Sequence, residues 1–172
     1  MSSPSAQQHK TKAADKGPVR VAVVTVSDTR TPETDVNGHY LAGRIEASGN
    51  HLHSTTIVRD EPLEVEAILE RLSSSTDVQV VFFNGGTGVS SRDRTYDVLA
   101  ARLEKTLPGF GEIFRMLSWE QVGASAMMSR ATAGVYRGKI IVSTPGSPAA
   151  VRLAWEKLIE PELAHLAWEV AR

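Results

Sequence analysis

The 172-residue sequence contains no cysteine, which excludes a disulfide framework, a thiolate zinc site and a thiol nucleophile. No apolar run approaches the roughly 20 residues that a membrane-spanning helix needs. The formal net charge is only -1, so nothing indicates a nucleic-acid partner or an acidic membrane partner. Hydrophobic residues make up 41% of the chain and charged residues 23%, as in an ordinary globular protein. At this length we expect one domain with a core of its own.

The beginning of the chain, MSSPSAQQHKTKAADKG, differs in composition from the rest. It cannot bury enough apolar surface to offset the entropy of ordering, so we expect a disordered tail over residues 1–17. A single domain over residues 18–172 follows. The tail has lysines but no apolar segment after them, so we do not expect a secretory signal, and we take the cytoplasm as the default location.

The order of strands and helices predicts the fold class. Runs of β-branched and apolar residues predict strands at about residues 19–28, 51–59 and 78–83. The first run is nearly continuous, as in a strand covered on both faces. Apolar residues recur at helical spacing between and after these runs, as in Val65, Ile68, Leu69 and Leu72. Two short strands around Arg137-Gly138 indicate a hairpin. We therefore expect a three-layer α/β fold with an open, mostly parallel sheet, flanking helices and a short antiparallel hairpin near the C-terminal part.

Ligands of such sheets bind beyond the carboxyl ends of the strands. Four segments follow strands directly and should share this carboxyl-terminal rim: Ser27-Asp28, Asp60, Gly85–Gly88 and Thr144–Ser147. We expect the chemistry of the protein to lie among them.

The stretch VVFFNGGTG ends a strand in three glycines and a threonine, Gly85, Gly86, Thr87 and Gly88. Glycine permits positive φ, so consecutive amides can turn inward as an anion-binding concavity at the start of the next helix. The alternative is a tight turn that needs glycine for its dihedral angles alone. The loop lacks the lysine of the GxxxxGK[ST] phosphate loop, so another group would have to balance the charge of an anion.

Two aspartates, Asp60 in RDEP and Asp93 in SSRDR, could hold a cation that balances this charge. Taken singly, each is better explained as a cap, of the helix that starts near Pro62 or near Thr95. Taken together, they lie in loops that should be neighbours on the rim. Two carboxylates near a phosphate suit Mg²⁺, which keeps several waters and takes one or two carboxylates plus substrate phosphates.

Other polar positions leave two readings open. Ser147, before Pro148, is a good N-cap but could equally bind a phosphate. Ser129-Arg130 and Ser27-Asp28 are either element ends or ligand contacts. His51 and His53 share one side of a strand, but with no third metal ligand nearby we expect exposed edge residues.

Seven motifs together resemble one known family. They are VSDTR, DVNGHYL, IVRDEP, FNGGTGVSSRD, PGFGEIFRMLS, MMSRATAG and TPGSP. Their order and spacing, from about Val19 to Glu162, resemble the molybdenum cofactor biosynthesis family that contains molybdopterin adenylyltransferases. DVNGHYL with PGFGEIFRMLSWEQVG looks most like the MoaB branch.

The resemblance implies Mg²⁺-dependent adenylyl transfer from ATP to the terminal phosphate of molybdopterin, with release of pyrophosphate. The two critical aspartates of the family fall on Asp60 and Asp93, and its nucleotide-phosphate loop falls on Gly85–Gly88. Contacts to the pterin phosphate fall on Ser129 and on Pro145, Gly146 and Ser147, and Ser27 and Asp28 line the same pocket. Many relatives have asparagine where this chain has Ser147.

The resemblance also implies homotrimers or hexamers and a downstream molybdenum-insertion protein as a partner. The helix bearing Phe110, Phe114 and Leu117 has apolar surface for such an interface. Two other functions remain open at this stage: a non-catalytic molybdopterin carrier or scaffold, and a nucleotide-phosphate hydrolase module on the same fold.

Overall fold

The computed structural model describes residues 16–171. The predicted tail over residues 1–17 therefore lies almost wholly outside the described residues. The strands are β1 (Arg20–Val26), β2 (His51–Val58), β3 (Val80–Asn84), β4 (Lys105–Thr106), β5 (Thr132–Tyr136) and β6 (Lys139–Thr144). The main helices are α2 (Val36–Ala47), α3 (Pro62–Ser73), α4 (Thr95–Arg102), α5 (Pro108–Val122), α6 (Pro148–Ala154) and α7 (Leu163–Val170). Within the described range, no helix is both long and apolar enough to cross a membrane.

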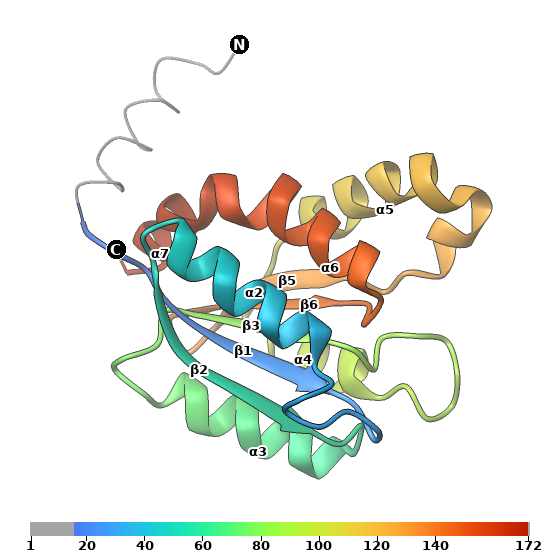
Figure 1. Ribbon diagram of the computed structural model, residues 1–172, viewed down its shortest axis with the longest axis horizontal. Helices are drawn as coiled ribbons and strands as arrows, with labels where there is room; N and C mark the ends of the chain where they lie inside the picture. The colour runs from blue at the N-terminus through green and yellow to red at the C-terminus, as the bar shows by residue number, and fades with distance from the viewer. Residues whose placement is uncertain (1–15, 172) are drawn as a thin grey trace.

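All six strands form one sheet in the order β2-β1-β3-β6-β5-β4. The first four of these are parallel to one another, whereas β5 pairs antiparallel with both β6 and β4. Helices cover both faces, with α2, α5, α6 and α7 on one side and α3 on the other (Figure 1). The predicted three-layer α/β fold with a C-terminal hairpin is confirmed.

Alternate residues of the parallel strands supply two separate cores. Val21 and Val23 of β1 face α2, α5, α6 and α7, where they meet buried Trp155. Ala22 and Val24 face α3 and α4, where they meet buried Leu99. Because β1, β3 and β6 are covered on both faces, they read in the sequence as nearly continuous apolar runs.

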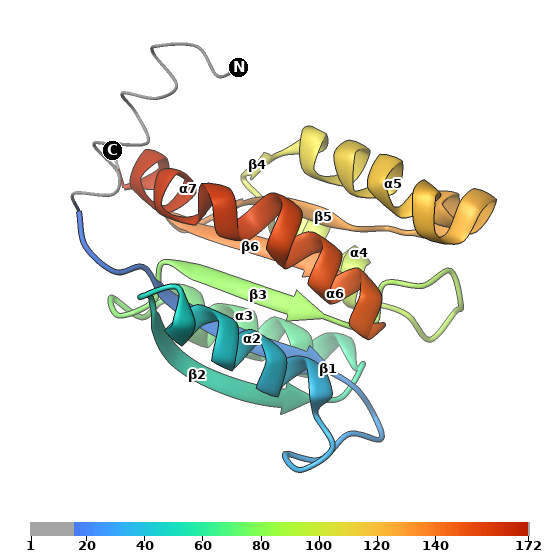
Figure 2. The ribbon, with the colours of Figure 1, turned by 45° about the horizontal axis from the view of Figure 1, so that its top comes forward.

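Two features were not predicted from the sequence. The two residues of β4 are exposed and too short to give a periodic signal. The C-terminal helices form one helical stretch, in which α6 continues through a widened π turn, η2 (Trp155–Ile159), and a short 3₁₀ turn, η3 (Glu160–Glu162), into α7. Figure 2 shows this stretch lying along β6 and β3. The widened turn precedes Pro161, which has no amide hydrogen for the helical ladder.

The path of the chain opens a crevice at the carboxyl end of β3. After β1 and β6 the chain turns to the face that holds α2 and α6, and after β3 it turns to the face that holds α4. The loop after β3 therefore diverges from the loops after both neighbouring strands. Such divergence is where ligands of open α/β sheets bind.

Candidate functional site

A cavity of about 320 Å³ lies at the end of β3. It joins the glycine loop after β3, the end of the short 3₁₀ helix η1 (Gly123–Met128) and the loop after β6. Its lining consists of Gly85, Gly86, Thr87, Gly88, Asp93, Met128, Ser129, Pro145 and Gly146. The structure thus brings together eight of the predicted site residues, from segments far apart in the sequence.

The glycine loop needs glycine for two different reasons. Gly85 and Gly86 have φ of 104° and 64°, a left-handed conformation that side chains rarely adopt. A Cβ on Gly85 would also lie 2.2 Å from the carbonyl oxygen of Val26. The amide of Gly85 donates to the carbonyl oxygen of Thr144 at 3.0 Å, which ties the loop to the end of β6.

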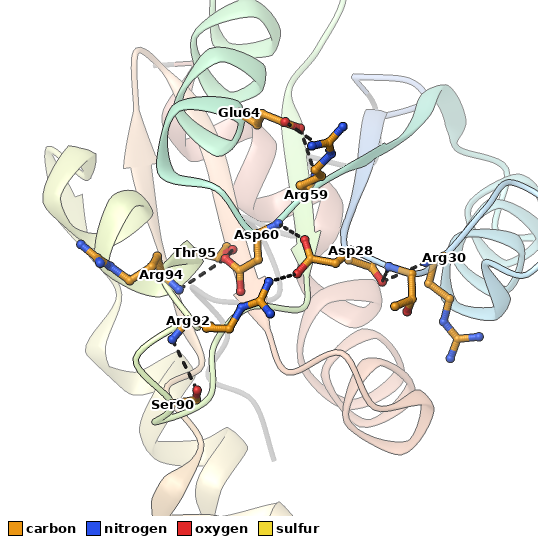
Figure 3. A network of polar contacts seen from close by, with 11 residues as sticks. Asp28, Arg30, Arg59, Asp60, Glu64, Ser90, Arg92, Arg94 and Thr95 are labelled. Atoms are coloured by element: carbon orange, nitrogen blue, oxygen red, sulfur yellow. Dashed lines mark hydrogen bonds and ion pairs between the residues drawn. The ribbon is translucent and has the colours of Figure 1, made fainter.

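Asp60 packs on this loop from the end of β2. Its carboxylate points toward Arg94 and Thr95 (Figure 3). Its Oδ1 accepts from the hydroxyl of Thr95 at 2.9 Å and from the amide of Arg94 at 3.3 Å. Its Oδ2 lies 2.6 Å from the position that a Cβ on Gly86 would take. Asp60 does not cap α3, whose N-cap is Glu61, and instead satisfies donors at the start of α4.

Asp93 lies against the same loop one step further along the chain. Its Oδ2 accepts from the amide of Ser90 at 3.1 Å and lies 2.7 Å from where a Cβ on Gly88 would be. The N-cap residue of α4 is Arg94, and no side chain caps it within its own helix. The φ of Gly88 is not in the left-handed range, so glycine is needed at this position because it leaves room for the carboxylate of Asp93.

The donor set of the two aspartates fits a magnesium ion. Among the described residues, Oδ2 of Asp60 and Oδ1 of Asp93 accept no hydrogen bond. No group of three or more histidine or acidic side chains that could hold a metal occurs within residues 16–171. Two carboxylates beside the glycine loop match the preference of Mg²⁺ for few protein ligands, with waters and substrate phosphates as the rest.

Ser27 and Asp28 lie outside the cavity lining, on the side of Asp60. The hydroxyl of Ser27 accepts from the amides of Thr29 and Arg30, which shapes the turn after β1. Oδ1 of Asp28 accepts from the amide of Asp60 at 3.3 Å, and its Oδ2 pairs with Arg92 at 2.7 Å. The Arg92 side chain is 78% exposed, so this ion pair contributes little to stability.

Ser147 also lies outside the cavity lining, and Ser129 lies within it. Ser147 is the N-cap of α6, and its hydroxyl accepts from the amide of Ala150 at 3.2 Å. Ser129 follows η1 directly, and its carbonyl oxygen accepts from Arg115 at 3.4 Å. The hydroxyl of Ser129 remains available to a ligand in the cavity, because no hydrogen bond to it occurs in the described chain.

Arg130 is the residue whose role the sequence left undecided. Its guanidinium donates to three backbone carbonyl oxygens, those of Thr87, Gly88 and Asp93, at 3.1, 2.7 and 2.8 Å. The remaining nitrogen pairs with the carboxylate of Asp97 at 2.9 Å. By binding carbonyls at both ends of the segment from Gly88 to Asp93, Arg130 fixes the loop that carries Asp93. A lone arginine after a polar serine was the only signal of this role in the sequence.

The apolar surface of α5 is not the predicted one. Phe110 and Phe114 are buried in the core and Leu117 packs against it, so none of them is free for an interface. The exposed large apolar side chains of this region are Ile113, Met116, Trp119, Val122, Met127 and Met128. The face predicted from the sequence was only the one with Phe110, Phe114 and Leu117, and packing places that face against the core. His51 and His53 are exposed on edge strand β2, as expected.

Comparisons with known proteins identify the family. A family model described as "Probable molybdopterin binding domain" matches residues 22–165. The molybdenum cofactor biosynthesis protein B of Bacillus subtilis is 47% identical over 171 residues, covering 98% of each chain. A crystal structure of a molybdenum cofactor biosynthesis protein B superposes with a TM-score of 0.88 at 45% identity, covering 90% of this chain and 97% of the other.

A more distant solved structure extends the likeness. The tungsten cofactor synthesizing protein MoaB from Pyrococcus furiosus superposes with a TM-score of 0.81 at 31% identity, covering 90% of this chain and 98% of the other. The family match spans most of this chain, and nearly all of each relative is covered. This chain therefore belongs to the molybdenum cofactor biosynthesis family with a MoaB/MogA-like molybdopterin-binding domain.

Proposed function

We propose that this protein transfers the adenylyl group of ATP to molybdopterin in a Mg²⁺-dependent reaction. One observation carries the proposal: two carboxylates, Asp60 and Asp93, pack directly on a glycine loop suited to bind phosphate. The membership in a molybdenum cofactor biosynthesis family supports the pterin as the second substrate.

In this reaction an oxygen of the terminal phosphate of molybdopterin attacks the α-phosphorus of ATP. A new P–O–P link forms while the bond from the α-phosphorus to the bridging oxygen breaks, and pyrophosphate leaves with that electron pair. A phosphate monoester has a second pKa near 6, so the nucleophile is already ionised at pH 7 and needs no strong general base. The chain's contribution is to bind and align the two phosphates.

Each segment has a role in this alignment. In the loop from Gly85 to Gly88, the amides of Gly86, Thr87 and Gly88 bind the ATP phosphates, since that of Gly85 donates to the carbonyl oxygen of Thr144. Ser129 with the segment Pro145–Ser147 holds the pterin phosphate. Asp60 and Asp93 would hold Mg²⁺, which supplies positive charge to the phosphate oxygens. Arg130 keeps Asp93 and the glycine loop in register.

The test is incubation of the protein with molybdopterin, ATP and Mg²⁺, followed by measurement of pyrophosphate and of adenylylated pterin. We expect Asp60→Asn and Asp93→Asn to lower the rate about 100-fold or more. Asparagine at position 60 keeps an oxygen that accepts from Thr95, so the start of α4 is retained while the charge is removed. Asp77→Asn, at an exposed site before β3, is the matched control.

The outcomes separate this proposal from a carrier. A carrier or scaffold would bind molybdopterin without consuming ATP, and a hydrolase module would consume nucleotide without the pterin. Wild-type rates in both aspartate variants, with Asp77→Asn also unaffected, would remove Asp60 and Asp93 from the mechanism.

We further propose that the protein assembles into homotrimers or hexamers and delivers its product to the downstream molybdenum-insertion protein. The exposed apolar side chains of α5 and η1 support the assembly. Six of the nine large hydrophobic side chains exposed in the described residues fall between Ile113 and Met128. Such a concentration is typical of a protein–protein contact.

A further inference from the structure

Four polar side chains are buried at the carboxyl ends of β1 and β3, and the proposed reaction uses none of them. They are Thr25, Asp35, Asn37 and Asn84, each with at most 8% of its surface exposed. Two of them belong to the motif DVNGHYL, whose residues have no role in the site described so far. Buried polar groups are costly unless they are hydrogen-bonded, so their partners define what they do.

The four side chains form one continuous chain of hydrogen bonds. The hydroxyl of Thr25 donates to Oδ2 of Asp35 at 2.8 Å, and Nδ2 of Asn84 donates to that hydroxyl oxygen at 3.0 Å. Nδ2 of Asn37 donates to Oδ1 of Asn84 at 2.9 Å and to the carbonyl oxygen of Gly146 at 2.8 Å. Nδ2 of Asn84 also donates to the carbonyl oxygen of Val24 at 3.2 Å. Because backbone carbonyl oxygens only accept, the bonds to Val24 and Gly146 fix the direction of every donor along the chain.

Each polar residue of DVNG has a defined task in this network. Asp35 is the N-cap of α2 and accepts from the amide of Gly38 at 2.9 Å. Gly38 makes room for it, since a Cβ there would lie 2.2 Å from Oδ2 of Asp35. Asn37 then projects from the first turn of α2 toward both Asn84 and Gly146.

The network ends on the two loops that line the cavity. Asn84 directly precedes Gly85 in the glycine loop. Gly146 lies close to the same loop, since a Cβ added to Gly146 would lie 3.1 Å from Cα of Gly85. We propose that Asn37 is a positioning residue that sets the spacing between the glycine loop and the loop after β6. In the proposed function, on which this inference rests, those loops hold the two reacting phosphates, so Asn37 controls their alignment.

This role predicts a particular kinetic signature for Asn37→Ala. Each loop can still bind its own substrate, so the KM values for ATP and for molybdopterin should change by less than about threefold. The two phosphates are no longer held at the attack distance, so kcat should fall about tenfold or more. Asn37→Ser, which keeps one short donor, should lie between the wild type and Asn37→Ala.

Asn50→Ala is the matched control, because Asn50 makes a comparable link at the opposite end of β1. Its Oδ1 accepts from the amide of Val19 at 2.9 Å, far from the cavity. It should lower the melting temperature as Asn37→Ala does and leave kcat unchanged. A fall in kcat of equal size in both variants would overturn the positioning role, because it would show that loss of stability alone slows the reaction.

Amide hydrogen exchange in the ligand-free protein tests the inference independently of catalysis. Asn37→Ala, or Asn37→Ser if the alanine variant does not fold, should speed exchange about tenfold at residues 84–88 and at Gly146 and Ser147. Asn50→Ala should leave both segments unchanged. Unaltered exchange in the Asn37 variant would refute the inference. If the wild type lacks adenylyl transfer, the proposed function fails, and the exchange result still decides the role of Asn37.

Discussion

Replacing Gly86 by alanine should damage both stability and activity, and the structure provides a control that separates the causes. Gly86 and Gly49 both have positive φ, 64° and 76°. Nothing lies within 4 Å of a Cβ on Gly49, which follows the last turn of α2. A Cβ on Gly86 would lie 2.2 Å from Oγ1 of Thr95 and 2.6 Å from Oδ2 of Asp60.

The two variants share the cost of the left-handed backbone. That cost is about 1–2 kcal/mol, and alanine recovers about 0.4–1 kcal/mol by restricting the unfolded chain. Gly49→Ala should therefore lose about 1 kcal/mol, a fall of about 2–4 °C in melting temperature. Gly86→Ala should also break the hydrogen bond from Thr95 to Asp60, which is worth about 1.5–3 kcal/mol as a bond to a charged group.

Gly86→Ala should thus lose about 3 kcal/mol, and its adenylyl transfer should fall about 100-fold. To reach an ordinary van der Waals separation, the Asp60 carboxylate has to move by about 1 Å, a displacement that can cost this factor. Thermal unfolding and the pyrophosphate assay measure the two effects, with Gly49→Ala retaining full activity. If Gly86→Ala has the same melting temperature as Gly49→Ala and keeps the wild-type rate of adenylyl transfer, Asp60 is not held against the glycine loop as described.

Three other expectations follow from single contacts. Arg130→Lys keeps the charge, but lysine cannot reach the three carbonyl oxygens that Arg130 binds, so kcat/KM should fall about tenfold or more. An unchanged kcat/KM would show that the loop carrying Asp93 keeps its conformation without Arg130. Burial and the hydrogen bond to Glu156 raise the pKa of Tyr40 to about 12, so its stabilisation is full below pH 10 and is lost as the pH rises toward 12. In denaturant unfolding, Tyr40→Phe should therefore have a lower free energy of unfolding than the wild type at pH 8. Above pH 10 its free energy of unfolding should depend less on pH. Trp119, 61% exposed, should be covered in the oligomer, so light scattering of Trp119→Glu should show smaller particles, and an unaltered mass would place the interface elsewhere.

Much of the fold follows from local sequence patterns. The helix α3 shows its buried face at Val65, Ile68, Leu69 and Leu72, and all four are buried. The carboxyl-terminal rim follows from a general rule, because parallel strands with alternating helices bring strand-exit loops together. The contact between Asp28 and Asp60, 32 residues apart, is an instance of that rule.

The remaining features depend on contacts between distant segments. Asn37 meets the carbonyl of Gly146 across 109 residues, and Arg130 meets that of Gly88 across 42. Nothing local distinguishes these side chains from a solvated asparagine or arginine. The prediction that Phe110, Phe114 and Leu117 form the interface side of α5 was wrong for a related reason. Helical spacing identifies an apolar face, but only the position of the sheet decides whether that face is buried.

The position of Asp60 and Asp93 also bears on the choice between an enzyme and a carrier. Both carboxylates pack on the loop that would bind phosphate. A negative charge about 5 Å from a phosphate charge costs about 3 kcal/mol at an effective dielectric constant of 20. A protein that only stored a phosphorylated pterin would bind it better with neutral residues at these two positions. The hydrogen bonds from Arg94, Thr95 and Ser90 need an acceptor oxygen, which a neutral amide also provides. The negative charge itself is useful where a cation is bound together with the phosphates.

Asp60→Asn should therefore have opposite effects on binding and on catalysis. In buffer with a chelator, calorimetric titration with pyrophosphate should show about tenfold tighter binding to the variant, because salt screens part of the repulsion. With Mg²⁺ present the advantage should vanish or reverse, and adenylyl transfer should remain low. Asp77→Asn should change neither affinity. Weaker pyrophosphate binding by Asp60→Asn in the chelator would mean that this carboxylate assists the anion directly, and a cation would then not be its reason for lying at the loop.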